Sequence, residues 1–210
     1  MRCIKLIKLN CSSRMNRNKL SKIMLSTNFI CNLFYSLSYP YIYAEMMKVV
    51  SSRYVSAEQL IECSGVIILG IIWNKKGDWL YKHFRWLIVA ELIADAVLFS
   101  HVLLTGDLKF YFVLNVLIYA LLSRHISNGG IRLRAKVHPD EQSREKYDNN
   151  CNIANSAATL IGAGVALLCP LPLTGLFIAA LIGNVFDNFC YWYIYNTINK
   201  IVAEEAQKEG

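Results

Sequence analysis

The sequence predicts an all-α, polytopic membrane protein built as a bundle of six transmembrane helices. Two observations lead to this fold class. The chain has 210 residues, of which 55% are hydrophobic and only 18% are charged, whereas about a quarter of the residues in soluble domains are charged. Apolar stretches also recur along the whole chain between short basic clusters, and several approach the ~20 residues that one membrane span needs.

Three regions follow from this pattern. Residues 1–23 form a basic N-terminal segment without an acidic residue, residues 24–198 form the transmembrane domain, and residues 199–210 form a C-terminal tail. Within the domain, the predicted spans are Met24–Met47, Val55–Trp73, Trp86–Leu104, Leu108–Ser123, Cys151–Cys169 and Thr174–Ile198.

The six spans differ in how well they suit a membrane. The first contains Pro40, which predicts a kink. The second begins with Glu58 and Glu62, and carboxylates are costly in lipid. The fourth is short for a hydrocarbon layer of about 30 Å, since a helix rises about 1.5 Å per residue. The second and fourth spans are therefore the weakest of the six.

The distribution of basic residues favours six spans over four. With six spans and a cytoplasmic N-terminus, only Lys48, Arg53 and Lys109 of the 22 lysines and arginines lie outside. Without the two weak spans, the basic cluster at residues 75–85 would also lie outside. Because cytoplasmic loops are enriched in Lys and Arg, we expect both termini in the cytoplasm and a location in the plasma (inner) membrane.

The longest connection, about residues 124–150, is polar and is predicted to be a cytoplasmic loop. Within it, "PDEQSREKYD" predicts a short surface helix that Pro139 opens. In the fifth span, small residues recur at every fourth position and predict close packing against another helix. They are Ala154, Ala158, Gly162 and Ala166.

Polar residues lie deep within the predicted spans. "WLIVAELIADAVLF" places Asp95 near the midpoint of the third span and Glu91 one turn away on the same face. "GNVFDN" places Asp187 at a similar depth in the sixth span, between Asn184 and Asn188. Because ionisable residues in membranes face the bundle interior or a water-filled cavity, we expect a polar central cavity.

Amides from two further spans are predicted to line the same cavity. Asn28 and Asn32 share a face of the first span, and Asn115 lies near the middle of the fourth. The predicted lining thus combines amides from three spans with carboxylates from two, which would suit a polar solute.

The carboxylates have two interpretations. Asp95 and Asp187, if adjacent, cannot both ionise without a large cost in free energy, so they are candidates for binding a substrate or protons. Interhelical hydrogen bonding is the alternative for both. For Glu91 we expect a structural ion pair with Arg124 at the inner end of the fourth span.

Motifs of enzymes and metal sites are missing from the sequence. It contains no H-E-x-x-H, no G-x-S-x-G and no phosphate-binding glycine loop. The seven cysteines include no C-x-x-C and have no zinc spacing with the histidines. We therefore expect no enzymatic activity, no cofactor and no metal, and interpret the cysteines as buried free thiols. The net charge of +7 indicates cytoplasmic loops and no nucleic-acid partner.

The turn between the second and third spans, "GIIWNKKGDW", resembles the signature loop of the major facilitator superfamily, G-x-x-x-D-[RK]-x-G-[RK]-[RK]. Gly70, Lys75 and Gly77 match in order and spacing. Asn74 stands where the family has aspartate, and Asp78 where it has a basic residue. The resemblance implies that these residues form a gating loop.

Two other segments are similar to the same family. Arg124 precedes "HISNGG", which is similar to the family's R-x-x-x-G-x-G with Gly129 and Gly130 near the glycine positions. The glycine-rich fifth span ends at Pro170, much as the family's G-x-x-x-G-P helix does. The resemblance covers about residues 20–198 and corresponds to the N-terminal six-helix half of a family whose members have two halves.

This resemblance implies a half-size transporter of a small solute, with proton coupling as one form of energy input. It would work in the lipid bilayer as a homodimer or with a second six-helix half. Two other functions fit the same sequence. One is a non-transporting accessory or immunity protein, and the other is the substrate-binding subunit of an energy-coupling transporter, docked on its ATPase module through the small-residue ridge.

Overall fold

The computed structural model describes residues 2–169 and 171–209, so Pro170, the predicted end of the fifth span, lies outside the described residues. The described residues contain helices and no strand, which confirms the all-α class. The elements are α1 (Arg2–Val49), α2 (Ser52–Lys82), α3 (Phe84–Thr105), α4 (Leu108–Ile118), the π-helical turn η1 (Tyr119–Ser123), α5 (Arg124–Val137), α6 (Glu141–Leu168) and α7 (Leu173–Glu209).

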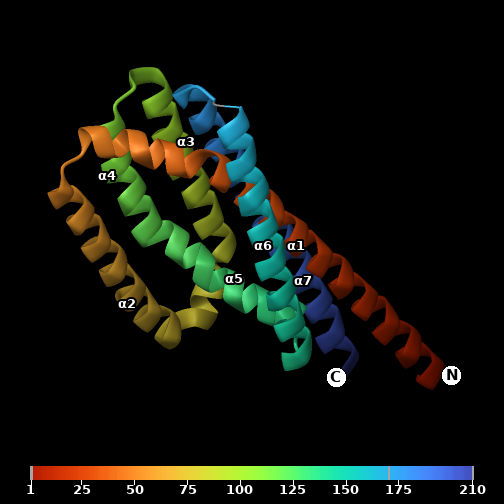
Figure 1. The fold of residues 1–210 in the computed structure, drawn as a ribbon. Helices are drawn as coiled ribbons and strands as arrows, with labels where there is room; N and C mark the ends of the chain where they lie inside the picture. The colour runs from red at the N-terminus through yellow and green to blue at the C-terminus, as the bar shows by residue number, and fades with distance from the viewer. Residues whose placement is uncertain (1, 170, 210) are drawn as a thin grey trace.

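The described chain forms six helical rods, because α4, η1 and α5 follow one another without a break from Leu108 to Val137. The rods run up and down, so both ends of the chain lie at the same end of the bundle (Figure 1). α1 packs along both α6 and α7, and its C-terminal part, which contains Pro40, bends away from the line of its N-terminal part (Figure 1).

Five rods in the described part of the chain are long and apolar enough to cross a membrane. They cover Arg53–Lys82, Phe84–Thr105, Leu108–Val137, Glu141–Leu168 and Leu173–Gln207. This is the character of an integral membrane protein. The two spans that are weakest in the sequence are both among the five, and the fourth gains its missing length because the helix continues through α5.

α1 is not among these five helices, although the sequence predicts a span at Met24–Met47. Its mean hydropathy is lowered by serines, asparagines and tyrosines, several of which bond to neighbouring helices. Leu20, Cys31 and Ile42 of α1 are almost fully buried. A helix enclosed by other helices needs less apolar surface than one surrounded by lipid, which explains how α1 can hold a central place with a polar sequence.

The prediction of a loop over residues 124–150 is wrong. α5 occupies Arg124–Val137 and α6 starts at Glu141, so only three residues connect them. The Asp140 carboxylate caps α6 by accepting a hydrogen bond from the Ser143 backbone N–H at 2.7 Å. The predicted short surface helix is therefore the first part of α6. Helices that extend beyond a hydrocarbon layer carry polar residues, which in the sequence look like a loop.

The small-residue ridge of α6 packs against α1, as predicted. Ala158 and Gly162 are buried, and a Cβ atom at Gly162 would lie 2.7 Å from the Leu33 carbonyl oxygen and 2.9 Å from Ser36 Cβ. Glycine is therefore required where these two backbones approach each other. Because α1 covers the ridge, it is not free to dock another protein such as an ATPase module.

Two clusters of buried apolar side chains lie at different heights of the bundle. The cluster nearer the chain termini includes Phe84 and Ile88 of α3 and Ile194 of α7. The other includes Leu98 of α3 and Ala180 of α7. Between these positions, both helices carry polar residues, so a polar layer separates two apolar ones.

Candidate functional site

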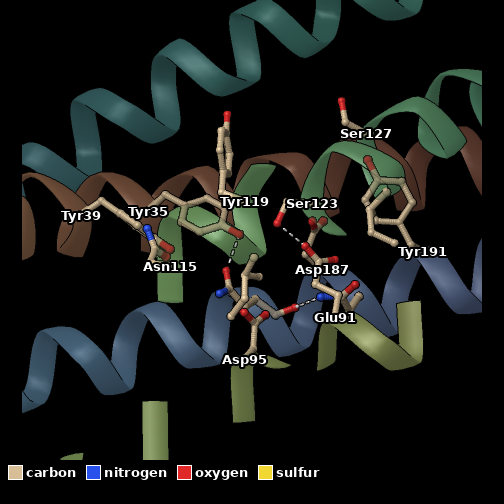
Figure 2. A pocket seen from close by; sticks show the side chains of 14 residues that line it. Tyr35, Tyr39, Glu91, Asp95, Asn115, Tyr119, Ser123, Ser127, Asp187 and Tyr191 are labelled. Atoms are coloured by element: carbon tan, nitrogen blue, oxygen red, sulfur yellow. Dashed lines mark hydrogen bonds between the residues drawn. The ribbon is translucent and has the colours of Figure 1, made fainter. Parts of the chain in front are cut away.

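A cavity of about 400 Å³ lies in this polar layer (Figure 2). Its walls come from α1, α3, α7 and the rod formed by α4, η1 and α5. It is lined by Tyr35, Tyr39, Glu91, Asp95, Asn115, Ile118, Tyr119, Ser123, Ile126, Ser127, Asn184, Asp187, Asn188 and Tyr191. Its volume lies in the range of natural small-molecule sites.

Three carboxylates face the cavity. Glu91 and Asp95 lie one turn apart on α3 and are only 7% and 5% exposed, and Asp187 comes from the neighbouring α7. The described lining residues include no lysine, arginine or histidine. Since uncompensated negative charges are costly in a low-dielectric interior, the cavity favours a bound cation or protons.

Glu91 is held by a hydroxyl and not by the predicted ion pair. The Ser123 Oγ of η1 donates a hydrogen bond to Glu91 Oε1 at 2.5 Å. Arg124 forms no ion pair among the described residues, and its guanidinium lies 4.8 Å from the centre of the Tyr119 ring. The prediction of a Glu91–Arg124 pair is therefore wrong, because Ser123 occupies the position that faces Glu91 and the next side chain points elsewhere.

The amides of α7, Asn184 and Asn188, form hydrogen bonds within the cavity wall. Tyr35 donates its hydroxyl hydrogen to Asn184 Oδ1. Asn188 Nδ2 donates to the Asn184 backbone carbonyl at 3.2 Å. Asn188 is only 4% exposed, and its Oδ1 is a buried acceptor without a hydrogen-bond partner. Cys31 Sγ contacts Asp187 Oδ1 at 3.5 Å. The cavity thus holds an unused acceptor beside its carboxylates.

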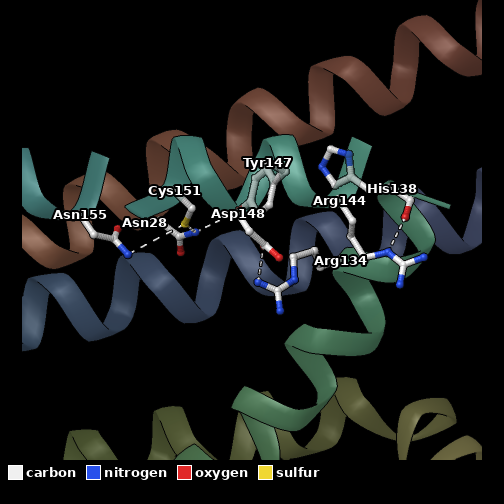
Figure 3. Close-up of polar contacts among 8 residues, drawn as sticks. All are labelled: Asn28, Arg134, His138, Arg144, Tyr147, Asp148, Cys151 and Asn155. Carbon is white, nitrogen blue, oxygen red and sulfur yellow. Dashed lines mark hydrogen bonds and ion pairs between the residues drawn. The ribbon is translucent and has the colours of Figure 1, made fainter. Parts of the chain in front are cut away.

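Five of the predicted cavity residues line this one space, and they come from three rods: Asp95, Asn115, Asn184, Asp187 and Asn188. The other two, Asn28 and Asn32, do not. Asn28 Nδ2 donates to Tyr147 Oη at 3.0 Å and lies 2.9 Å from Cys151 Sγ. Asn32 Nδ2 donates to Asn155 Oδ1 at 2.9 Å. Both join α1 to α6, so their prediction as cavity residues is wrong. Figure 3 shows Asn28 beside Tyr147 and Cys151.

Several lining residues are missing from the prediction. Ser123 and Ser127 are four residues apart, which is the spacing of one helix face, but Ser127 falls in the segment that the sequence predicts to be a loop. The lining tyrosines could have been chosen only with knowledge of helix orientation. They are Tyr35, Tyr39, Tyr119 and Tyr191.

The residues of the predicted gating loop lie in a helix. α2 continues to Lys82, with non-helical backbone angles at Lys76 (φ −128°, ψ 20°), and only His83 separates it from α3. The chain therefore bends within the predicted turn, but through a kink between two helical pieces and not through an extended loop. Asp78 forms an ion pair with Arg132 of α5, which ties the end of α2 to the rod beside it.

The other residues of this segment surround the same contact. Asn74, Lys75, Gly77 and Asp78 line a hollow of about 470 Å³ at the end of α2. A Cβ atom at Gly77 would lie 2.1 Å from an Arg132 guanidinium nitrogen. A Cβ atom at Gly70 would meet no neighbour within 4 Å, so Gly70 takes no part in this contact.

Polar contacts also join α5, α6 and α7 at the end that carries the termini. Arg134 forms an ion pair with Asp148 at 2.8 Å, and Arg144 donates to the His138 carbonyl at 3.2 Å (Figure 3). Tyr195 Oη lies 3.0 Å from the carbonyl oxygens at the end of α2. At this end of the bundle, polar contacts therefore connect most of the helical rods.

The arrangement of the three carboxylates can be compared with that of a metal site. No group of three histidine, cysteine, aspartate or glutamate side chains among them could hold one. The three cavity carboxylates therefore do not converge on a single point. They are distributed along the wall, which suits a ligand of several atoms.

A scan of the chain against protein-family models, a search of curated proteins and a search of solved structures each return no match. The resemblance to the major facilitator superfamily rests on the sequence motifs alone. The function is therefore argued from the cavity.

Proposed function

We propose that this chain is a membrane transport protein, one six-helix half of a carrier that holds a small polar solute in its central cavity. The cavity itself carries the proposal. Three carboxylates and three amides line one space between two apolar layers, where polar side chains are expensive and usually functional.

The position of the cavity supports this function. Secondary transporters bind their substrates near the bilayer midplane, between helices that move relative to one another. Here the lining residues lie midway along α3 and α7. Asp95 and Asp187 are the candidates to bind the solute or carry protons. We assign Glu91 a structural part, since Ser123 already bonds to it.

A second half is part of the proposal. α2 and α6 expose many large apolar side chains, among them Leu60 and Ile67 on α2 and Ile153 and Leu160 on α6. These surfaces can face lipid or another six-helix unit. Alternating access requires one half to move against another, so the working unit would be a homodimer or a pair with a second half.

Uptake into proteoliposomes tests the proposal. The protein is reconstituted and offered labelled amines, amino acids, sugars and carboxylates, each with and without a pH gradient. Vesicles that contain the wild-type protein should accumulate one of these classes of solute. Asp95→Asn and Asp187→Asn should lower that uptake by about tenfold or more, which corresponds to roughly 1.4 kcal/mol.

Glu45→Gln is the matched control, because Glu45 pairs with Lys48 at an exposed position of α1 and does not line the cavity. This variant should transport as the wild type does. If folded protein accumulates no class above empty vesicles, the accessory or immunity role replaces transport.

A further inference from the structure

The charges around the cavity exclude several kinds of solute. Glu91, Asp95 and Asp187 line it without any basic side chain among the described lining residues. An anion would be repelled, and a neutral solute would leave bound protons alone to offset the negative charge. A solute with positive charge offsets them directly.

The unpartnered acceptor Asn188 Oδ1 narrows the range of cationic solutes that fit the cavity. Asn188 Oδ1 is buried in the cavity wall without a donor, and burying an acceptor without a partner costs free energy. A primary ammonium has three N–H donors, enough for this oxygen and a neighbouring carboxylate together. A quaternary ammonium has none, so it cannot satisfy Asn188.

The size of the cavity favours a larger ligand than a bare metal ion. The carboxylates do not form a group that could coordinate one, and the cavity of about 400 Å³ is far larger than an ion needs. Tyrosine rings, including those of Tyr35 and Tyr39, form part of the wall, and aromatic rings attract cations through their faces. A multi-atom cation with apolar carbons between its charges fits this lining.

We infer that the cavity binds a small organic cation with primary ammonium groups, of the linear diamine class. This inference rests on the proposed transport function, because it names the substrate class of the same cavity. The ammonium ends would bond to Asp95, Asp187 and Asn188, and the carbon chain would lie against the tyrosine rings.

Thermal unfolding of the purified full-length protein in mild detergent tests the inference. The probes are 1,4-diaminobutane, its neutral analogue 1,4-butanediol, succinate and tetramethylammonium, all at one ionic strength. Only 1,4-diaminobutane should raise the unfolding midpoint in a saturable way. Because this series uses the unmodified protein, it does not depend on whether any variant folds.

Variants then locate the site. Asp95→Asn and Asp187→Asn should weaken diamine binding about tenfold or more, and Glu45→Gln should bind as the wild type does. The inference is overturned if the diol or succinate stabilises the protein as strongly, if no diamine binds, or if both aspartate variants bind unchanged.

Uptake measurements distinguish a failure of this inference from a failure of the proposed transport function. If a sugar or a carboxylate is transported and the aspartate variants abolish its uptake, the carrier function stands and the diamine inference fails. If diaminobutane binds through both aspartates but never accumulates in proteoliposomes, the binding site stands and the transport function fails.

Discussion

At the scale of single residues, the hydroxyl of Ser123 donates a hydrogen bond to the buried carboxylate of Glu91. Replacing Ser123 with alanine removes the donor of a 2.5 Å hydrogen bond and leaves a buried carboxylate less well satisfied. We expect Ser123→Ala to lower the free energy of unfolding by about 1–3 kcal/mol. Unfolding in detergent, followed by intrinsic fluorescence, measures the change.

Ser127→Ala is the matched control for that variant. Ser127 lies one turn further along, also lines the cavity, and is exposed, so its loss should change stability by no more than about 0.5 kcal/mol. Equal effects of the two alanines would show that Glu91 does not depend on Ser123.

His138 gives the protein a sensitivity to pH outside its spans. It is 7% exposed, and burial lowers its pKa below the usual 6.5. The nearby carboxylates of Asp140 and Asp148 oppose this shift in the pKa, whereas Arg134 and Arg144 add to it. The folded state therefore binds fewer protons at this ring than the unfolded state does when the pH falls through 6.5.

The stability that His138 contributes is thus fully present above about pH 6.5 and is lost as the pH falls below that value. We expect the unfolding midpoint to fall more steeply between pH 7.5 and 5.5 in the wild type than in His138→Gln. His83→Gln, at the half-buried turn between α2 and α3, serves as the control. Parallel pH profiles for the wild type and His138→Gln would contradict this assignment.

Residue type and depth were enough to predict part of the cavity. Asp95 and Asp187 were recognisable because a carboxylate midway along an apolar run has few structural uses. Asn28 and Asn32 carry a similar signal, yet they bond to α6. Depth in a span does not reveal which neighbour a helix face meets. The same reasoning therefore could not distinguish residues that line the cavity from residues that bond to another helix.

At the scale of elements, the contact between α1 and α6 depends on Gly162. A Cβ atom there would lie 2.7 Å from a backbone oxygen of α1, and a backbone cannot move aside as a flexible side chain can. We expect Gly162→Ala to destabilise the protein by about 1–3 kcal/mol, measured by thermal unfolding in the same detergent.

Gly164, two residues further along α6, is the matched control, because a Cβ atom there would meet no neighbour within 4 Å. Gly164→Ala should therefore leave stability unchanged or raise it by up to about 1 kcal/mol, since alanine is the better helix former. A loss of stability in both variants would indicate that α6 tolerates no substitution of its glycines, and would not support a close contact with α1.

Element boundaries were less predictable than element type. Each predicted span overlaps a helix of the structure, but most of the helices extend beyond the apolar runs, and α5 lies in no predicted span. Segments such as Arg124–Val137 are polar although they continue a helix long enough to cross a membrane, and polarity there does not distinguish a helix from a loop. Close packing by the α6 ridge was predictable, because small residues at every fourth position of a membrane helix allow a neighbouring backbone to approach.

At the scale of the whole molecule, the exposed apolar sides of α2 and α6 lead us to expect two copies in the purified complex. Native mass spectrometry after extraction in mild detergent measures this directly. A mass of twice the chain supports the homodimer, and a heavier complex with a different six-helix protein supports a pair of unlike halves. A monomer that retains solute uptake would rule out the need for a second half.

The π-helical turn η1 explains how three polar side chains of one rod all reach the cavity. Asn115, Ser123 and Ser127 all line the cavity, yet in an uninterrupted α-helix Ser123 and Ser127 would be rotated from Asn115 by about 80° and 120°. The wider turn η1 (Tyr119–Ser123) absorbs one residue without advancing the rotation, which brings both serines to within about 20° of Asn115. A single surplus residue in one rod thus aligns three polar groups that regular winding would have spread around a third of its circumference.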